Sequence, residues 1–226
     1  MSKFNRFQQQ PHIKMVHESG KGVPFVDWKD IEKSNGAPRL REGLFVFGQR
    51  ARAIERMVKP LPFGMPERDY DAIPVPACGS RADRMTALAD ALWDAFADRG
   101  YSWVGFYTKE AGADEMILGP RRDKPACSPI GLHGMCGYCW LERRCVVVRD
   151  VREIGESYVA CDPRDMSEVV VPLLEADGSC WGVLDVDSFE VGAFSESDAI
   201  GLARLVERAG LSEPLGNRAW PVVAGG

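Results

Sequence analysis

Two apolar runs separated by a short turn constrain the fold of this chain most. Residues 169–174 read VVVPLL, residues 180–186 read CWGVLDV, and Asp177-Gly178 lies between them. An Asp-Gly pair between two apolar segments is a strong signal for a β-hairpin, because glycine readily takes the left-handed conformation of a tight turn. The sequence therefore predicts an antiparallel pair of strands in the second half of the chain.

Further strands and two helices flank this hairpin. Ser80 and Ser195 are capping residues that precede apolar stripes with helical spacing. Residues 103–108 and 116–118 are rich in strand formers and predict a second hairpin, and residues 145–149 predict a further strand. This order of elements predicts an α+β domain with a central antiparallel sheet and helices packed on one face.

The segments between these elements are expected to be long loops. Residues 119–134 and 150–165 have little periodicity, and long ordered loops in compact domains are often functional. The composition around them predicts three parts: an N-terminal extension with a proline-rich connector (1–79), the α+β domain (80–211) and a C-terminal tail (212–226).

Charge and composition exclude several classes of function. The 28 basic and 33 acidic residues give a net charge of -5, which argues against a nucleic-acid partner. No apolar run is long enough for a membrane span, and the N-terminus lacks the apolar segment of a signal peptide. We therefore expect a cytoplasmic protein, in which the seven cysteines are thiols with catalytic or metal-binding roles.

Thiols and carboxylates gather around the predicted hairpin. Acids flanked by valine and leucine in a strand are costly unless they are paired or functional, and two acids at alternate positions share one face. This pattern suggests thiol redox chemistry on a small polar substrate. The alternative is that the thiols are ordinary small core residues and that the acids cap turns. The residues concerned are Cys127, Cys136, Cys161, Glu168, Asp185 and Asp187.

A zinc site is a further alternative. His133, Cys136 and Cys139 have H-x2-C-x2-C spacing, Cys145 follows, and sulfur ligands suit zinc. However, Cys139 falls in the first turn of a short helix that the sequence predicts at residues 137–144, and Cys145 opens an apolar strand. We therefore expect neither a metal ion nor another cofactor.

The chain resembles the GAF domain, and more closely the free methionine-(R)-sulfoxide reductases, which are single GAF domains. The general GAF pattern is weakly specific, since most GAF domains bind ligands without catalysing a reaction. Three cysteines at loop positions together with the acids make a more specific signal. The resemblance covers roughly residues 80–210 and rests on WVGFY, LGP, KPAC, GMCG, DV, ACD, SEVVVPL and GVLDVDS, in the family's order.

The resemblance implies the reduction of free methionine-(R)-sulfoxide to methionine by a cysteine thiolate, through a sulfenic acid and an intramolecular disulfide that thioredoxin reduces. Cys161 matches the cysteine that attacks the substrate sulfur, and Cys127 matches the one that resolves the intermediate. Cys136 matches a third cysteine whose role is less settled.

The resemblance also implies a substrate pocket. Glu168 matches a catalytic pocket acid, and we expect it to donate a proton to the sulfoxide oxygen. Asp185 and Asp187 match further carboxylates that line the pocket, and we expect them to hold the ammonium group of the substrate. Trp103 and Tyr107 match the aromatic wall of the pocket. A homodimer is also implied, because GAF domains often pair through their terminal helices.

The chain departs from the family in two loops and at its N-terminus. The segment between Cys127 and Cys136, with PIGLHGMCG, is one residue shorter than in the family, and the segment before Cys161 is one residue longer. Cys139, Cys145 and the first 79 residues have no counterpart. These changes leave open a second function, a non-catalytic GAF module that senses a small ligand or redox state.

Overall fold

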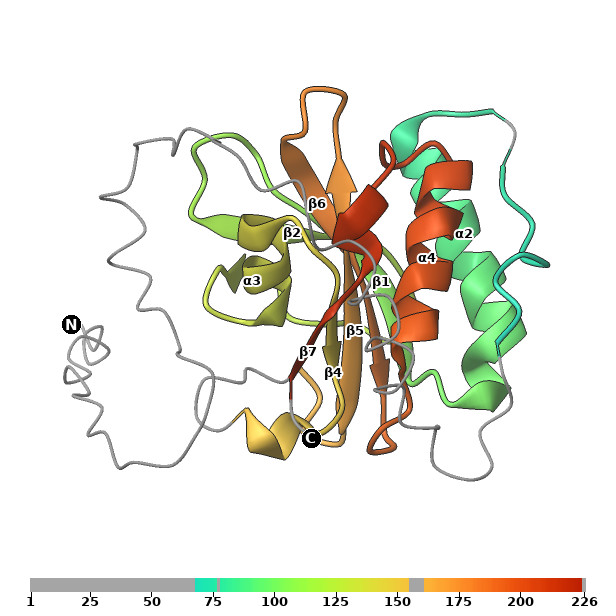
Figure 1. Ribbon diagram of the computed structural model, residues 1–226, viewed down its shortest axis with the longest axis vertical. Coiled ribbons are helices and arrows are strands. Elements are labelled where there is room, and N and C mark those ends of the chain that lie inside the picture. The colour runs from blue at the N-terminus through green and yellow to red at the C-terminus, as the bar shows by residue number, and fades with distance from the viewer. Residues whose placement is uncertain (1–67, 77, 155–160, 225–226) are drawn as a thin grey trace, which may run out of the picture. The chain divides into compact units, whose positions relative to one another are not determined.

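The computed structural model describes residues 68–76, 78–154 and 161–224 of this 226-residue chain. These residues form one sheet of seven strands with three α-helices and short 3-10 turns around it (Figure 1). No helix in these ranges is long and apolar enough to cross a membrane. In chain order the elements are α2 (Arg81–Phe96), η2 (Ala97–Arg99), β1 (Trp103–Thr108), β2 (Glu115–Arg122), β3 (Ile130–Gly131), α3 (Met135–Glu142), β4 (Val146–Val148), η3 (Val151–Glu153), β5 (Ser167–Leu174), β6 (Cys180–Ser188), α4 (Glu196–Arg208), η5 (Gly216–Ala219) and β7 (Val222–Ala224).

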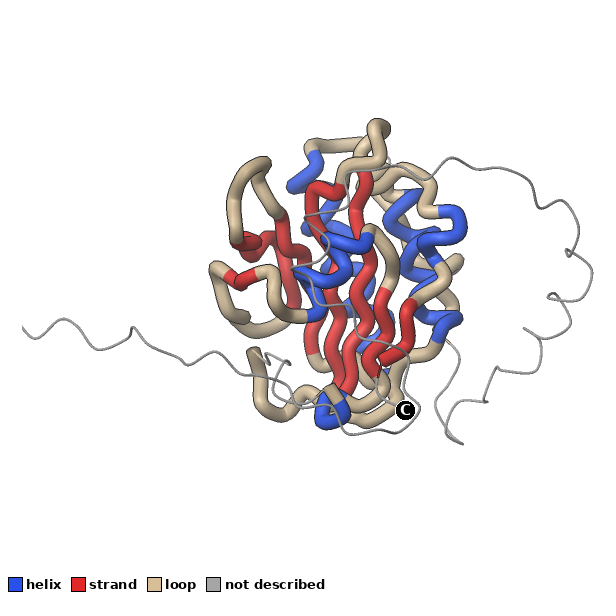
Figure 2. Tube along the Cα trace, turned by 60° about the vertical axis from the view of Figure 1, so that its left-hand side comes forward, coloured by secondary structure: helices blue, strands red, loops and turns tan. Residues whose placement is uncertain are grey.

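The sheet has the strand order β3-β2-β1-β6-β5-β4-β7, and Figure 2 shows its strands side by side. Its neighbouring strands are antiparallel except β4 and β7, which are parallel. The predicted hairpin forms the β5–β6 pair, and Gly178 in its turn has a φ of 78°. The α+β architecture is therefore confirmed, with the correction that the parallel β4–β7 pair makes the sheet mixed.

Helices cover both faces of the sheet. α2 and α4 lie together on one face, as expected, and α3 lies on the other (Figure 1). Both long helices begin with a capping box, Ser80 with Asp83 and Ser195 with Asp198. The sequence did not predict α3 as a cover for the opposite face.

The buried strands explain why a second cover is needed. All eight residues of β5 are buried, so each face of this strand requires a packed layer. Val169 and Val171 belong to the core beneath α2 and α4. Val170 belongs to a second, smaller core beneath α3. The second core also forms the floor of the candidate site.

Three strand regions differ from the sequence prediction. β2 is longer than the expected strand at 116–118, and β3 lies within the expected loop at 119–134. The tail at 212–226 contributes β7, whose Val222 is the register partner of Val146 in β4. β3 and β7 have two and three residues, so their pairing with a neighbour, rather than their own pattern, defines them.

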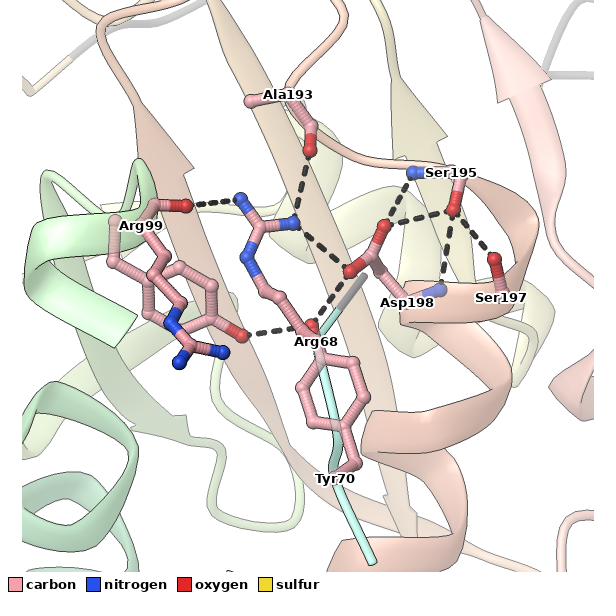
Figure 3. Close-up of polar contacts among 8 residues, drawn as sticks. Arg68, Tyr70, Arg99, Ala193, Ser195, Ser197 and Asp198 are labelled. Carbon is pink, nitrogen blue, oxygen red and sulfur yellow. Dashed lines mark hydrogen bonds and ion pairs between the residues drawn. The ribbon is translucent and has the colours of Figure 1, made fainter. Parts of the chain in front are cut away.

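The segment before α2 is held by a buried ion pair (Figure 3). Arg68 Nη1 lies 2.9 Å from Asp198 Oδ1 and donates to the Ala193 carbonyl at 3.0 Å, while Nη2 donates to the Arg99 carbonyl at 2.7 Å. The Tyr70 hydroxyl donates to the same Asp198 oxygen at 2.8 Å. The last residues of the expected extension thus contact the helices, and its first 67 residues lie outside the described ranges.

Candidate active site

The strand register brings an aromatic ring and three acids together on the α3 face of the sheet. Trp103 of β1 pairs with Asp187 of β6, which in turn pairs with Glu168 of β5. Two residues further along β1, Gly105 pairs with Asp185 of β6. Because alternate residues of a strand share a face, these side chains project into the same space. Glu168 and Asp185 are only 5% and 7% exposed.

Gly105 allows the aromatic wall to form. A side chain at this position would collide with the Trp103 indole ring, so only glycine leaves the ring its place over the sheet. Trp103 Nε1 donates to the Lys124 carbonyl at 3.1 Å, and the Tyr107 hydroxyl donates to the Cys127 carbonyl at 3.0 Å. The two aromatic residues therefore also fix the segment that carries Cys127.

Cys136 enters the site from the first turn of α3. Its thiol donates a hydrogen bond to Asp185 Oδ2 at 3.3 Å and is buried. Gly137 allows this close approach of the helix, because a Cβ there would overlap the backbone of Leu132. The predicted third cysteine is thus in direct contact with a predicted pocket acid.

Cys161 and Cys127 lie on two neighbouring segments at the edge of the site, and both are exposed. The Cys161 thiol interacts with Cys127 and lies 4.0 Å from the Tyr107 hydroxyl oxygen. An ion pair joins the two segments, with Lys124 Nζ 2.7 Å from Asp162 Oδ2. The one-residue insertion expected before Cys161 falls near residues 155–160, which lie outside the described ranges.

These groups surround one pocket of about 290 Å³. All eight sequence-predicted site residues line it: Trp103, Tyr107, Cys127, Cys136, Cys161, Glu168, Asp185 and Asp187. Asp165, His133 and residues 129–131 line the pocket as well. Of these, the sequence pointed only to His133, and only as a possible zinc ligand. Asp165 accepts a hydrogen bond from Ser102 Oγ at 2.8 Å, and nothing in its irregular sequence context distinguishes it.

The interior of the pocket favours neutral groups. Burial raises the pKa of Asp185 well above its ordinary value, and the nearby Glu168 carboxyl adds to the shift. The pKa of Asp187 is also raised, mainly by burial and next by the nearby Asp185 carboxyl. The Cys136 thiol also has a raised pKa, through burial first and Asp185 second. In the empty pocket these three side chains therefore favour their protonated forms, and a bound ligand can accept or displace their protons.

Two adjacent residues at the edge of the pocket, Cys161 and Asp162, have pKa shifts in opposite directions. Partial burial and then the thiol of Cys127 raise the pKa of Cys161 to about 12, so this group is a thiol at neutral pH. The neighbouring Asp162 has a lowered pKa, because Arg164 and Lys124 bind its carboxylate. The ion pair thus keeps its charge next to an uncharged thiol.

The proposed zinc ligands of the H-x2-C-x2-C stretch do not form one set in the described part of the chain. Cys139 is packed in the core beneath α3, whereas Cys145 belongs to the core beneath α2 and α4. Another set does come together there: Cys136, Glu168 and Asp185 each place a potential ligand atom within 4.8 Å of the others.

Comparison with known proteins places this chain in a family. The GAF domain sequence profile matches residues 80–211. The free methionine-R-sulfoxide reductase of Saccharomyces cerevisiae is 32% identical over 127 residues, which cover 54% of this chain and 70% of the yeast protein. The chain belongs to the GAF-domain free methionine-R-sulfoxide reductase family.

Two further members of this family are similar to the chain. The free methionine-R-sulfoxide reductase of Escherichia coli is 37% identical over 107 residues, which cover 46% of this chain and 62% of the bacterial protein. The X-ray structure of the Neisseria meningitidis enzyme in complex with its substrate matches with a TM-score of 0.53 and 35% identity. That match covers 62% of this chain and 78% of the Neisseria chain. The resemblance in the sequence motifs therefore extends to the fold.

Proposed function

We propose that this protein reduces free methionine-(R)-sulfoxide to methionine. The observation that carries the proposal is the pocket itself, in which two neighbouring thiols at the edge face buried acids and two aromatic rings. The free methionine-R-sulfoxide reductase names of the similar proteins support the same activity.

The first chemical step takes place at Cys161. Its sulfur attacks the sulfoxide sulfur and forms a transient S–S bond. The substrate S–O bond and this S–S bond then break as the oxygen transfers to Cys161, which becomes a sulfenic acid, and methionine leaves. The proton count balances, because one thiol and one sulfoxide give one sulfenic acid and one thioether. Since Cys161 is a thiol at neutral pH, the substrate or a neighbouring base must accept its proton during the attack.

The buried acids supply the proton that the sulfoxide oxygen needs. The sequence led us to expect Glu168 in this role, with Asp185 and Asp187 holding the ammonium group. The raised pKa values of both aspartates favour their neutral forms in the empty pocket. An ammonium group beside either aspartate lowers its pKa, so substrate binding itself releases a proton next to the sulfoxide.

The second and third steps regenerate the thiols. Cys127 attacks the sulfenic sulfur of Cys161, which forms a disulfide and releases water, and this prevents further oxidation of Cys161. Thioredoxin then donates two electrons by thiol–disulfide exchange at the exposed edge of the pocket. Such a cycle requires a reducing compartment, and we place it in the cytosol.

Two further assignments complete the proposal. Trp103 and Tyr107 form the wall against which the methionine side chain packs, and both rings are almost fully buried. Cys136 acts as a hydrogen-bond donor to Asp185 rather than as the resolving thiol. The homodimer and the boundaries of the domain at residues 80 and 211 remain predictions, which light scattering and limited proteolysis would check.

A coupled assay tests the proposed activity. The purified full chain is mixed with thioredoxin, thioredoxin reductase and NADPH, and NADPH oxidation is followed with each epimer of free methionine sulfoxide. We expect consumption with the R epimer and none with Cys161→Ser. Folded, reduced protein that consumes neither epimer would overturn the proposal and favour the ligand-sensing GAF module.

A further inference from the structure

A thiol and two carboxyl groups from three different elements converge on the floor of the pocket. Cys136 comes from α3, Glu168 from β5 and Asp185 from β6, and one potential ligand atom of each lies within 4.8 Å of the others. The three residues are 6%, 5% and 7% exposed. This cluster is separate from the exposed thiols of Cys127 and Cys161.

A second observation points to a missing ligand at the same place. Asp185 Oδ2 accepts the Cys136 hydrogen bond, and the Asp185 and Glu168 carboxyl groups interact with each other, but Asp185 Oδ1 is buried and has no N–H, O–H or S–H donor among the described residues. A buried carboxylate oxygen without a partner costs about 1–3 kcal/mol or more, so such atoms usually serve a ligand or an ordered water. Asp185 lines the pocket, where such a ligand has access.

The donor set defines the chemistry of that ligand. One sulfur and two carboxylate oxygens suit a thiophilic divalent cation better than Mg²⁺ or Ca²⁺, which prefer oxygen alone. Tetrahedral zinc, with bonds of about 2.3 Å to sulfur and about 2.1 Å to oxygen, places its ligand atoms roughly 3.4–3.6 Å from one another. The three ligand atoms lie within 4.8 Å of one another, so side-chain movements that shorten these separations by up to about 1.3 Å would allow them to bind one ion.

We propose that Cys136, Glu168 and Asp185 form a binding site for a thiophilic divalent cation such as Zn²⁺, and that the bound ion excludes the substrate from the pocket. The ion replaces the protons of the ligands and reduces the repulsion between the two buried carboxylates. The exclusion of substrate rests on the proposed function, whereas the binding of the ion does not.

Cd²⁺ reports binding directly, because a cadmium–thiolate bond absorbs in the ultraviolet. The full chain with Cys127→Ser and Cys161→Ser removes the two exposed pocket thiols that also attract Cd²⁺. We expect this double variant to develop the absorption band and to saturate at one Cd²⁺ per chain. Addition of Cys136→Ser should abolish the band.

Cys139 provides the matched control, since it is buried on the same helix but lies outside the cluster. Cys139→Ala in the double variant should leave the band unchanged. Should Cys136→Ser fold poorly by near-ultraviolet circular dichroism, Asp185→Asn provides the test, with an expected loss of Cd²⁺ affinity of at least tenfold. A band that persists in folded Cys136→Ser, or an affinity that Asp185→Asn leaves intact, would overturn the metal site.

Calorimetry on the double variant tests the exclusion of substrate. Methionine-(R)-sulfoxide should bind in metal-free buffer and bind at least tenfold more weakly after saturation with Zn²⁺. Equal affinity in both buffers, or no binding in either, would overturn the exclusion. The Cd²⁺ absorption titration tests the metal site whatever the calorimetry shows. Its outcome also does not depend on the result of the reductase assay.

Discussion

At the scale of single residues, the resting pocket keeps its reactive groups protonated. Burial raises the pKa of Asp185, Asp187 and the thiol of Cys136, and partial burial raises that of Cys161. A thiolate that is absent before substrate binds is protected from oxidants, because oxidation follows thiolate character. The account therefore predicts an enzyme whose reactive thiol becomes nucleophilic in the presence of substrate.

Alkylation measures this property of Cys161. With a pKa of about 12, its reaction with iodoacetamide should rise about tenfold per pH unit from about pH 7 to about pH 10. A free thiol such as glutathione, with a pKa of roughly 8.5–9, should level off within that range. At about pH 8, Cys161 should react at least about tenfold more slowly than glutathione, after allowance for the greater nucleophilicity of a more basic thiolate.

Peptide mapping by mass spectrometry follows Cys161 separately from the other cysteines. A rate for Cys161 that levels off below about pH 9 would contradict the raised pKa and would mean that the empty pocket already stabilises the thiolate.

At the scale of elements, the ion pair between Lys124 and Asp162 joins the segments of the two exposed cysteines. Asp162 directly follows Cys161, and Lys124 also lies 4.6 Å from the centre of the Phe189 ring. The pair is partly buried, with 26% and 14% of the two side chains exposed, so solvent screens it less than a surface pair. It holds the two thiols within reach of each other.

Lys124→Met should slow the formation of the Cys127–Cys161 disulfide about tenfold, because the two thiols lose their fixed separation. The first step, methionine formation, should change by less than about threefold. Arg164→Met is the matched control: Arg164 also binds Asp162, at 2.7 Å, but does not bridge to the Cys127 segment. Rapid chemical quench with peptide mapping separates the two steps, and equal slowing of both would contradict a role in resolution.

Elements with a pattern of their own were predictable from the sequence, and those defined by a neighbour were not. The helix caps at Ser80 and Ser195 and the turn at Gly178 are local signals, and the structure confirms all three. β7 exists because it pairs with β4 across a long sequence separation, and its exposed and half-buried residues carry no alternation to detect.

The same distinction applies to the site. Cysteines and strand acids are informative residue types, so the motifs identified the eight predicted residues that line the pocket. Asp165 and His133 are polar residues in irregular segments, and only the tertiary fold brings them to the pocket. The cluster of Cys136 with Glu168 and Asp185 was hidden for the same reason, because its three members come from separate elements.

At the scale of the whole molecule, Arg68 ties the segment before the matched family region to α4. Its guanidinium and the Asp198 carboxylate are 3% and 7% exposed, and Tyr70 shares the same carboxylate. Removal of one member of a buried pair leaves the other charge uncompensated, which typically costs about 3–5 kcal/mol. Residues 68–73 should therefore be necessary for stability even though they precede the GAF match.

Arg68→Met should lower the free energy of unfolding by roughly 3 kcal/mol and Tm by several degrees. Asp71→Ala is the control, because the Asp71 side chain is exposed and lies 3.8 Å from Arg208, a long contact, while its backbone hydrogen bond to Asp69 is kept in the variant. It should change stability by less than about 0.5 kcal/mol. Urea denaturation of the full-length variants provides the measurement, and equal stability of Arg68→Met and the unchanged protein would contradict this anchoring role.

A single-turnover experiment without thioredoxin tests the central claim most directly. Reduced protein is mixed with an excess of methionine-(R)-sulfoxide, methionine is quantified, and the cysteine peptides are mapped. The account predicts one methionine per chain with a Cys127–Cys161 disulfide, one methionine with a sulfenic acid at Cys161 in Cys127→Ser, and none in Cys161→Ser. Methionine formed by folded Cys161→Ser in the same amount would contradict the assignment of the attacking thiol.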